Sequence, residues 1–334
     1  MLRLRWLKQW GIWLGISLLT LGLVVGCQRS DPLESGSGIA ENCISVEHAA
    51  GTACVPKQFE RLITLDGVAL EYALALDLTP VATVSSGLTG HLEEYLAEVE
   101  DAGQAGEPNF EKILALKPDL LLGIDAEYVQ GLYSQISQIA TTVVFGFEHS
   151  GQWRERFQWI AEALGRAEIA QQTMDAYYSR LADFKVQMGD QLPELKVSVV
   201  RVYPDGINLY LRDSFCGTVL QDAGLSRPDA QDVSAEAAMS RFNNPIQTRI
   251  SRELLDQADG DVIFLWTGEN TPEAAEAAQA KLQALQQDPL WQQLKAVQQG
   301  RVYGVPSYWI GSGPIAANRV IDDLFKYLVN NSST

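Results

Sequence analysis

Short apolar runs alternate with segments of helical spacing over residues 61–147. The expected strands are residues 61–66, 80–86, 119–124 and 141–147, and the expected helices are residues 67–78, 91–100 and 109–117. The run DLLLGI at 119–124 is almost continuously apolar, which is typical of a strand buried on both faces. Because strands and helices alternate, this region predicts a parallel sheet covered by helices on both faces.

The pattern changes between Trp153 and Met188, where there is no proline and only Gly165 interrupts. Residues 153–164 predict one helix. Residues 166–188 predict a second helix of about 23 residues, roughly 35 Å long at 1.5 Å per residue. Pro193 ends this helical region, which therefore predicts a long connection between two other parts of the chain.

Alternation of apolar runs and helices resumes after Pro193. The segments are residues 195–203, 207–211, 217–225, 261–266, 273–287 and 301–306, with a last helix from about Pro314 to Val329. We therefore predict an α/β fold of two Rossmann-like lobes joined by a single long helix. The N-terminal α/β lobe spans 41–150, the helical linker 151–190 and the C-terminal α/β lobe 191–334.

A sequence pattern that occurs twice, an internal echo, supports two related lobes. Residues 111–122 (EKILALKPDLLL) and 253–264 (ELLDQADGDVIF) each begin with a glutamate and have an aliphatic residue two positions later. Each also has an aspartate eight positions after the glutamate, followed by three apolar residues. The two segments fall at corresponding places in the predicted lobes.

The N-terminus has the layout of a secretory signal. Three basic residues among the first eight precede an uncharged, mostly apolar stretch at 10–26. Residues 24–27 (VVGC) resemble a bacterial lipobox, which predicts a lipoprotein signal peptide at 1–26 and a diacylglycerol on the thiol of Cys27. The alternative is an uncleaved transmembrane anchor, since about 18 apolar residues just span a bilayer. Both interpretations place the rest of the chain outside the cytoplasm.

The segment that follows is polar and rich in serine and glycine, so residues 27–40 predict a flexible tether to the membrane. Removing residues 1–26 takes away three of 25 basic residues and none of 42 acidic ones, which leaves a net charge of about −20. Such a charge argues against nucleic acid or an anionic lipid surface as a partner.

The cysteines predict one structural bridge. Cys43 and Cys54 flank a short segment with a turn signal at Gly51, so outside the cytoplasm they are expected to form a disulfide across a hairpin. Closing this loop is worth about 3 kcal/mol in the chain-entropy model. Two free thiols are the alternative. Cys216 is expected to be a small buried apolar residue.

The remaining chemistry argues for binding rather than catalysis. There are only three histidines, none at a ligand spacing from another, so we expect no metal site made by the protein. No G-x-S-x-G motif occurs, and no enzyme activity is expected. The rival from another class is an extracytoplasmic hydrolase, because a pair among 42 acidic residues could serve as acid and base.

Four stretches carry a family resemblance. They are "PNFEKILALKPDLLLG" (108–123), "RVYPDGINLYLRDSFCGTVLQDAGLSRP" (201–228), "ISRELLDQADGDVIFL" (250–265) and "DPLWQQLKAVQQGRVYGVPSYWIGSGPIAANRVIDDL" (288–324). The chain resembles the iron-siderophore substrate-binding proteins of ABC importers, the FecB/FhuD-like class that also includes cobalamin and haem binders. The resemblance implies a class III periplasmic binding protein, with two lobes, a rigid connecting helix and a shallow cleft.

The resemblance also implies a function. A lipid-anchored extracytoplasmic monomer would capture a ferric-siderophore or ferric-citrate-type chelate and deliver it to an ABC importer. The chelator would already wrap the iron, so no cofactor is bound directly. Glu111 and Glu253 match the family's acidic residues that pair with permease arginines; both also suit helix N-termini, where a glutamate is favourable. A cobalamin or haem binder of the same fold is the alternative within the class.

Candidate ligand contacts follow the carboxyl ends of the expected strands, where open α/β sheets bind their ligands. In the C-terminal lobe they are Arg201, Tyr203, Arg212, Phe215, Trp266, Tyr308 and Trp309, and Arg241 is expected in a loop that lines the same cleft. In the N-terminal lobe they are Asp66, Ser85, Ser86, Asp125, Glu148 and His149. Arginine offers forked donors to chelate oxygens and aromatic rings offer apolar contact. For Arg201 the alternative is a structural ion pair, and for haem either Tyr203 or Tyr308 would be the axial ligand.

Overall fold

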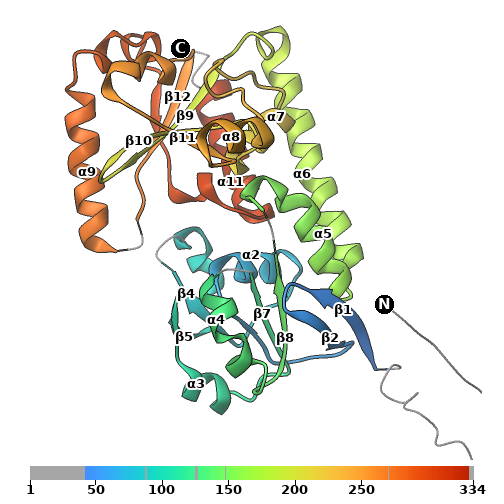
Figure 1. Ribbon diagram of the computed structural model, residues 1–334. Coiled ribbons are helices and arrows are strands. Elements are labelled where there is room, and N and C mark those ends of the chain that lie inside the picture. The colour runs from blue at the N-terminus through green and yellow to red at the C-terminus, as the bar shows by residue number, and fades with distance from the viewer. Residues whose placement is uncertain (1–41, 87–88, 125–126, 147, 270, 331–334) are drawn as a thin grey trace, which may run out of the picture. The chain divides into compact units, whose positions relative to one another are not determined.

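The computed structural model describes residues 42–86, 89–124, 127–146, 148–269 and 271–330 (Figure 1). The chain divides into two units, residues 1–37 and 38–334, and every described residue belongs to the second. The predicted signal peptide, Cys27 and the tether lie outside the described residues. Within the described ranges, no helix combines the length and the apolar character that crossing a bilayer requires.

A hairpin precedes the first lobe. Strands β1 (Cys43–His48) and β2 (Gly51–Pro56) pair antiparallel, and Cys43 and Cys54 form a disulfide with their Cα atoms 5.4 Å apart. The backbone N–H of Ala49 donates to the carbonyl oxygen of Val144 at 2.9 Å. This bond attaches the hairpin to the last strand of the N-terminal lobe.

The N-terminal lobe holds a six-stranded sheet in the order β6-β5-β4-β3-β7-β8. Its strands are β3 (Leu62–Thr64), β4 (Ala82–Ser85), β5 (Glu100–Gln104), β6 (Glu107–Pro108), β7 (Leu120–Ile124) and β8 (Thr141–Phe145). Its helices are α2 (Gly67–Ala75), α3 (Phe110–Ala115) and α4 (Glu127–Ile136). All neighbouring strands run parallel except β5 and β6, and apolar clusters lie on both faces of the sheet, as predicted.

The prediction of a helix at 91–100 is wrong. The chain there forms a 3-10 helix at Gly90–Tyr95 and then enters β5 at Glu100. The backbone N–H of Glu100 donates to the carbonyl oxygen of Val81 at 3.0 Å, which draws this polar segment into the sheet between β4 and β6. Pairing with a neighbouring strand therefore overrides a helical spacing of apolar residues.

The C-terminal lobe holds a five-stranded sheet in the order β11-β10-β9-β12-β13. Its strands are β9 (Val197–Tyr203), β10 (Gly206–Tyr210), β11 (Gln247–Ile250), β12 (Val262–Trp266) and β13 (Val302–Gly304). Its α-helices are α7 (Phe215–Asp222), α8 (Ala235–Phe242), α9 (Pro272–Gln286), α10 (Lys295–Gln298) and α11 (Pro314–Leu324), the last continued by a π-helical turn at Phe325–Val329. This sheet is mixed, because β10 pairs antiparallel with both β9 and β11.

Two helices join the lobes, α5 (Trp153–Ala163) and the 22-residue α6 (Ala167–Met188). In Figure 1, α6 runs alongside both lobes. Near its start, the hydroxyl of Thr173 donates to the carbonyl oxygen of Ala75 on α2 at 3.3 Å. Near its end, a guanidinium N–H of Arg180 donates to the carbonyl oxygen of Asn318 on α11 at 3.1 Å. One helix thus packs on both lobes, and the predicted class III fold is confirmed.

Candidate ligand-binding site

A cavity of about 760 Å³ is lined by residues from both lobes. Glu148 and His149, just after β8, contribute from the N-terminal lobe. The C-terminal lobe contributes residues of α8 and the loop after it: Ala235, Glu236, Met239, Ser240 and Pro245. A volume of this size lies within the range of pockets that hold small-molecule ligands.

Helix α8, which lines the cavity, is anchored at its N-terminus. The Ser234 side chain caps its N-terminus by accepting from the N–H of Ala237, and a carboxylate oxygen of Asp213 accepts from the N–H of Ala235 at 2.7 Å. Asn243 ends the helix in the left-handed conformation. Sequence reasoning missed these lining residues, and it placed Arg241 in a loop, whereas Arg241 lies exposed in the last turn of α8.

The N-terminal side of the cavity is fixed by contacts between lobes. The hydroxyl oxygen of Ser150 accepts from the backbone N–H of Phe215 on α7 at 3.3 Å. A Cβ atom on Gly151 would lie only 2.0 Å from the carbonyl oxygen of Asp213, so a glycine is required there. These contacts hold the loop after β8 against the C-terminal lobe beside Glu148 and His149.

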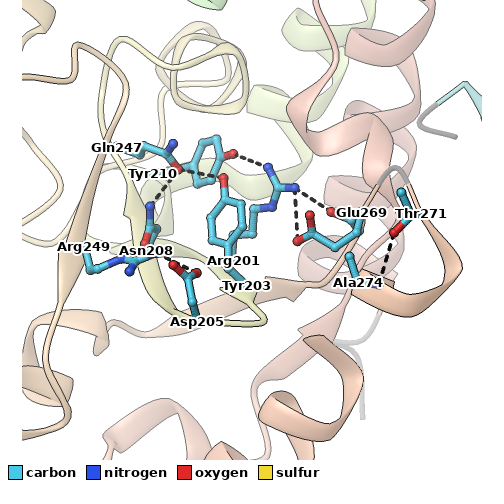
Figure 2. Close-up of polar contacts among 11 residues, drawn as sticks. Arg201, Tyr203, Asp205, Asn208, Tyr210, Gln247, Arg249, Glu269, Thr271 and Ala274 are labelled. Carbon is cyan, nitrogen blue, oxygen red and sulfur yellow. Dashed lines mark hydrogen bonds and ion pairs between the residues drawn. The ribbon is translucent and has the colours of Figure 1, made fainter. Parts of the chain in front are cut away.

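Arg201 lies at the centre of a dense polar cluster on β9 (Figure 2). Its guanidinium stacks between the rings of Tyr203 and Trp266, 3.9 and 4.1 Å from their centroids. It donates to the hydroxyl of Tyr210 at 3.2 Å and to the carbonyl oxygen of Gly268 at 2.5 Å. It also forms an ion pair with Glu269 at 3.6 Å. These contacts favour the alternative interpretation of Arg201, in which it forms a structural ion pair.

Tyr203 extends the cluster toward β11. Its hydroxyl donates to the side-chain oxygen of Gln247 at 3.1 Å, and the same oxygen accepts from the amide of Asn208 at 3.1 Å (Figure 2). Tyr203 is only half-buried. It therefore remains a candidate contact, held in place by a glutamine that sequence reasoning missed because it lies 44 residues away.

Arg212 is also paired with carboxylates. Its guanidinium lies 3.1 Å from Asp232 and 3.4 Å from Asp213, and Asp213 in turn holds the start of α8. About a third of its side chain is exposed. The structure therefore places Arg212 beside the cavity helix, with two negative charges around its own positive charge.

Three predicted aromatic contacts are corrected. Phe215, Trp266 and Trp309 are 1%, 1% and 0% exposed and belong to the main apolar cluster of the C-terminal lobe. The ring of Trp309 packs 4.3 Å from that of Phe264, centroid to centroid. Because an apolar core excludes ligand as well as water, these rings serve the packing of the lobe and do not face an open site.

Tyr308 is half-buried beside them. Its hydroxyl and the indole N–H of Trp309 both donate to the same carboxylate oxygen of Asp323, each at 2.8 Å. Burial, with a further contribution from Asp323, raises the pKa of Tyr308. The hydroxyls of Tyr203 and Tyr308 thus both donate to protein acceptors, an arrangement that does not favour either as a haem ligand.

Asp66 is structural. One carboxylate oxygen caps α2 by accepting from the N–H groups of Val68 and Ala69 at 2.9 and 2.8 Å. The other accepts from the N–H of Ile124 on β7 at 2.8 Å. Burial raises the pKa of Asp66 to about 6, against the effect of these bonds. Of the other first-lobe candidates, the Ser85 hydroxyl donates to the carbonyl oxygen of Gly103, and Asp125 lies outside the described residues.

The predicted docking glutamates occupy matching positions. Glu111 lies in the first turn of α3, and Glu253 lies in the first turn of a 3-10 helix at Arg252–Ala258. Both side chains are exposed. Elsewhere in the described ranges, no group of three or more His, Cys, Asp or Glu side chains is placed to hold a metal ion.

Two lobes, a long connecting helix and a cavity lined from both sides define a class III solute-binding protein. The chain belongs to the periplasmic binding protein family, whose sequence profile matches residues 62–309. The predicted family membership is confirmed.

Particular relatives cover most of the chain. The chain is 30% identical over 323 residues to the probable siderophore-binding lipoprotein YfiY of Bacillus subtilis, covering 94% of this chain and 96% of that protein. It is 29% identical to the achromobactin-binding periplasmic protein of Dickeya dadantii, over 79% of this chain and 85% of that one. Its fold matches Staphylococcus aureus SirA complexed with staphyloferrin B, with a TM-score of 0.72, 25% identity, and coverage of 85% and 98%.

Proposed function

We propose that the protein is an extracytoplasmic, lipid-anchored receptor that captures a ferric-siderophore or ferric-citrate-type chelate and delivers it to an ABC importer. The observation that carries the proposal is the cavity of about 760 Å³ lined from both lobes. Relatives whose names specify siderophores, achromobactin and staphyloferrin B support the ligand class. The proposal assigns binding and no catalysis to the chain.

The cavity suits a bulky chelate. Met239, Ala235 and Pro245 offer apolar surface, and Ser240 and His149 offer polar groups. A ligand pocket is typically apolar with a few placed polar groups. Such a surface would contact the organic chelator, and the iron would stay inside its own ligands.

Delivery would use the ends of the molecule that carry Glu111 and Glu253. One exposed glutamate on each lobe offers a two-point contact for arginines of a permease. Cys27 would hold the receptor at the membrane through its lipid, and residues 28–40 would let it reach the permease.

The test is calorimetric titration of the mature chain, with Cys27 replaced by serine, against ferric siderophores, ferric citrate, haem and cobalamin. We expect submicromolar binding of a ferric chelate. Ser240→Trp places a large ring in the cavity and should weaken binding by at least about a hundredfold. Ser179→Trp, on the exposed side of α6, is the matched control and should bind normally.

Two results would contradict the proposal. Tight binding of haem or cobalamin, with no binding of a ferric chelate, would show that the protein binds another class of ligand. Equal weakening by both tryptophan variants, or by neither, would show that the cavity beside α8 is not where the ligand binds.

A further inference from the structure

We infer that the bound ligand is a ferric chelate of low net charge, of the hydroxamate-rich kind, and not a trianionic tris-catecholate complex. This inference rests on the proposed function and names the class of chelate within it. It comes from the charges of the cavity lining and of the three arginines predicted as ligand contacts. Two of these arginines are matched by carboxylates, and the third, Arg241, stands outside the lining.

The first arginine, Arg201, is already paired with a carboxylate of the protein. Arg201 has a side chain only 10% exposed, and its partner Glu269 is 16% exposed. The rings of Tyr203 and Trp266 also pack against the guanidinium. An anionic ligand would have to displace Glu269 and leave a buried carboxylate without its partner, which is strongly unfavourable.

The second arginine, Arg212, lies beside two carboxylates. Arg212 lies between Asp213 and Asp232, so this group of three side chains carries a net negative charge. Asp213 cannot move away from Arg212 freely, because it also accepts from the N–H of Ala235 at the start of α8. A multiply charged anion near this end of α8 would be repelled by the second carboxylate.

The cavity lining itself is acidic. Among its described lining residues, Glu148 and Glu236 are carboxylates, and no lysine or arginine is present. No ion pair to either glutamate is found in the described part of the chain. Arg241 is exposed in the last turn of α8 and does not line the cavity. The nearest charges that a ligand meets from both lobes are therefore negative.

A chelate of low charge fits these surroundings. Hydroxamate complexes present carbonyl oxygens and methylene chains, which match the hydroxyl of Ser240 and the apolar surfaces of Met239 and Pro245. Salt screens charges only over distances of about 8 Å or more at physiological ionic strength. Glutamates that line the cavity are closer than this to a ligand inside it, so salt does not screen their charges from the ligand. The overall acidity of the chain then needs no compensating basic site.

The test compares chelates that differ in net charge. The probes are ferric desferrioxamine B (cationic), ferrichrome (neutral), ferric citrate (anionic) and ferric enterobactin (trianionic), titrated into the mature chain at low and high salt. We expect at least one hydroxamate complex to bind at least about tenfold more tightly than the trianion, with the gap narrowing at high salt.

A double variant, Glu148→Gln with Glu236→Gln, tests the cause. It should strengthen binding of the trianion by about tenfold and change binding of the neutral complex by less than about twofold. The matched control is Glu98→Gln with Glu194→Gln. These exposed glutamates, one in each lobe, lie just before the amino ends of β5 and β9, whereas Glu148 follows the carboxyl end of β8.

The outcomes separate the two proposals. If the trianion binds most tightly, or if the double variant leaves its binding unchanged, the inference on charge is overturned while the proposed function stands. If no ferric chelate binds the folded chain, the proposed function fails as well. An equal gain in the control pair would assign the effect to net charge and would also overturn the inference.

Discussion

The two lobes meet in two different ways, and both use glutamates. At the packed contact, Glu71 of α2 is 3% exposed and accepts from the backbone N–H of Ala316 at 2.7 Å. Its other carboxylate oxygen lies 3.5 Å from the imidazole of His91. At the cavity, Glu148 and Glu236 are exposed and line open space.

The difference between Glu71 and the cavity glutamates shows that a carboxylate stabilises the fold when it accepts a hydrogen bond from an otherwise unpaired backbone N–H. Helix α11 begins at Gly313, which offers no side-chain cap, and its first-turn N–H groups need an acceptor. Glu71 supplies that acceptor from the other lobe, so one hydrogen bond caps a helix and joins the lobes. Within the described ranges, no hydrogen-bond donor meets the side chains of Glu148 and Glu236, and both stay exposed.

The largest change in unfolding free energy should come from the aromatic residues that lie in the core of the C-terminal lobe. Trp309→Ala removes a fully buried ring and its bond to Asp323, and should cost about 3–5 kcal/mol of unfolding free energy. Phe242→Ala, an exposed aromatic of α8, is the control and should cost less than about 0.5 kcal/mol. Urea denaturation measures both, and equal costs would place Trp309 in the cleft after all.

A buried carboxylate in the N-terminal lobe should give the protein a specific pH dependence. Because the folded pKa of Asp66 is raised from 3.8 to about 6, the folded state binds the proton more tightly. The stabilising contribution of this group is therefore fully present below about pH 4 and is lost as the pH rises to about 6. The loss corresponds to about 3 kcal/mol.

Asp66→Asn isolates this contribution. The unfolding free energy of the wild type minus that of the variant should fall by about 3 kcal/mol between about pH 4 and 6.5, whatever other groups titrate. Denaturation at several pH values gives this difference directly. A difference that rises with pH would mean that the hydrogen bonds from Val68, Ala69 and Ile124 outweigh burial.

The packed contact itself can be broken by Glu71→Ala. The N–H of Ala316 then lies buried without its acceptor, so we expect a loss of about 1–3 kcal/mol. Glu94→Ala is the control, because Glu94 pairs with Arg319 of α11 at the exposed surface and should cost less than about 1 kcal/mol. A smaller loss for Glu71 than for Glu94 would contradict the role of Glu71 as a helix cap.

The smallest effect is expected at the cavity. Glu236→Gln removes one favourable charge from the first turn of α8 and should cost about 0.5 kcal/mol or less. The same denaturation series measures it beside Glu71→Ala. A cost as large as that of Glu71→Ala would mean that Glu236 belongs to the fold and is not held ready for a ligand.

Local patterns predicted most of the elements correctly. Apolar spacing predicted the long helix and the buried strands because both are short-range signals. The echo between the lobes also has a shared structural basis. Asp119 accepts from the N–H groups of Glu60 and Arg61 just before β3, and Asp261 accepts from that of Lys196 just before β9. Each aspartate ties its own strand to the start of the neighbouring one.

The candidate site was predicted less well. Glu148 and His149, which follow β8, line the cavity, but Phe215, Trp266 and Trp309 lie in the core. The strand Glu100–Gln104 was missed because its residues are mostly polar, and its pairing with β4 and β6 depends on the tertiary structure. The lining of the cavity by α8 was missed because its spacing resembles that of any exposed surface helix.

The sequence by itself determined the two-lobed α/β organisation and the family, because periodicity, turn residues and long motifs are all local properties of the chain. Only the tertiary structure decided which charges face each other. Arg201 meets Glu269, 68 residues away, and Glu71 meets Ala316, 245 residues away. Ion pairs and caps between distant residues depend on how the sheets bring them together, and no spacing along the chain records that.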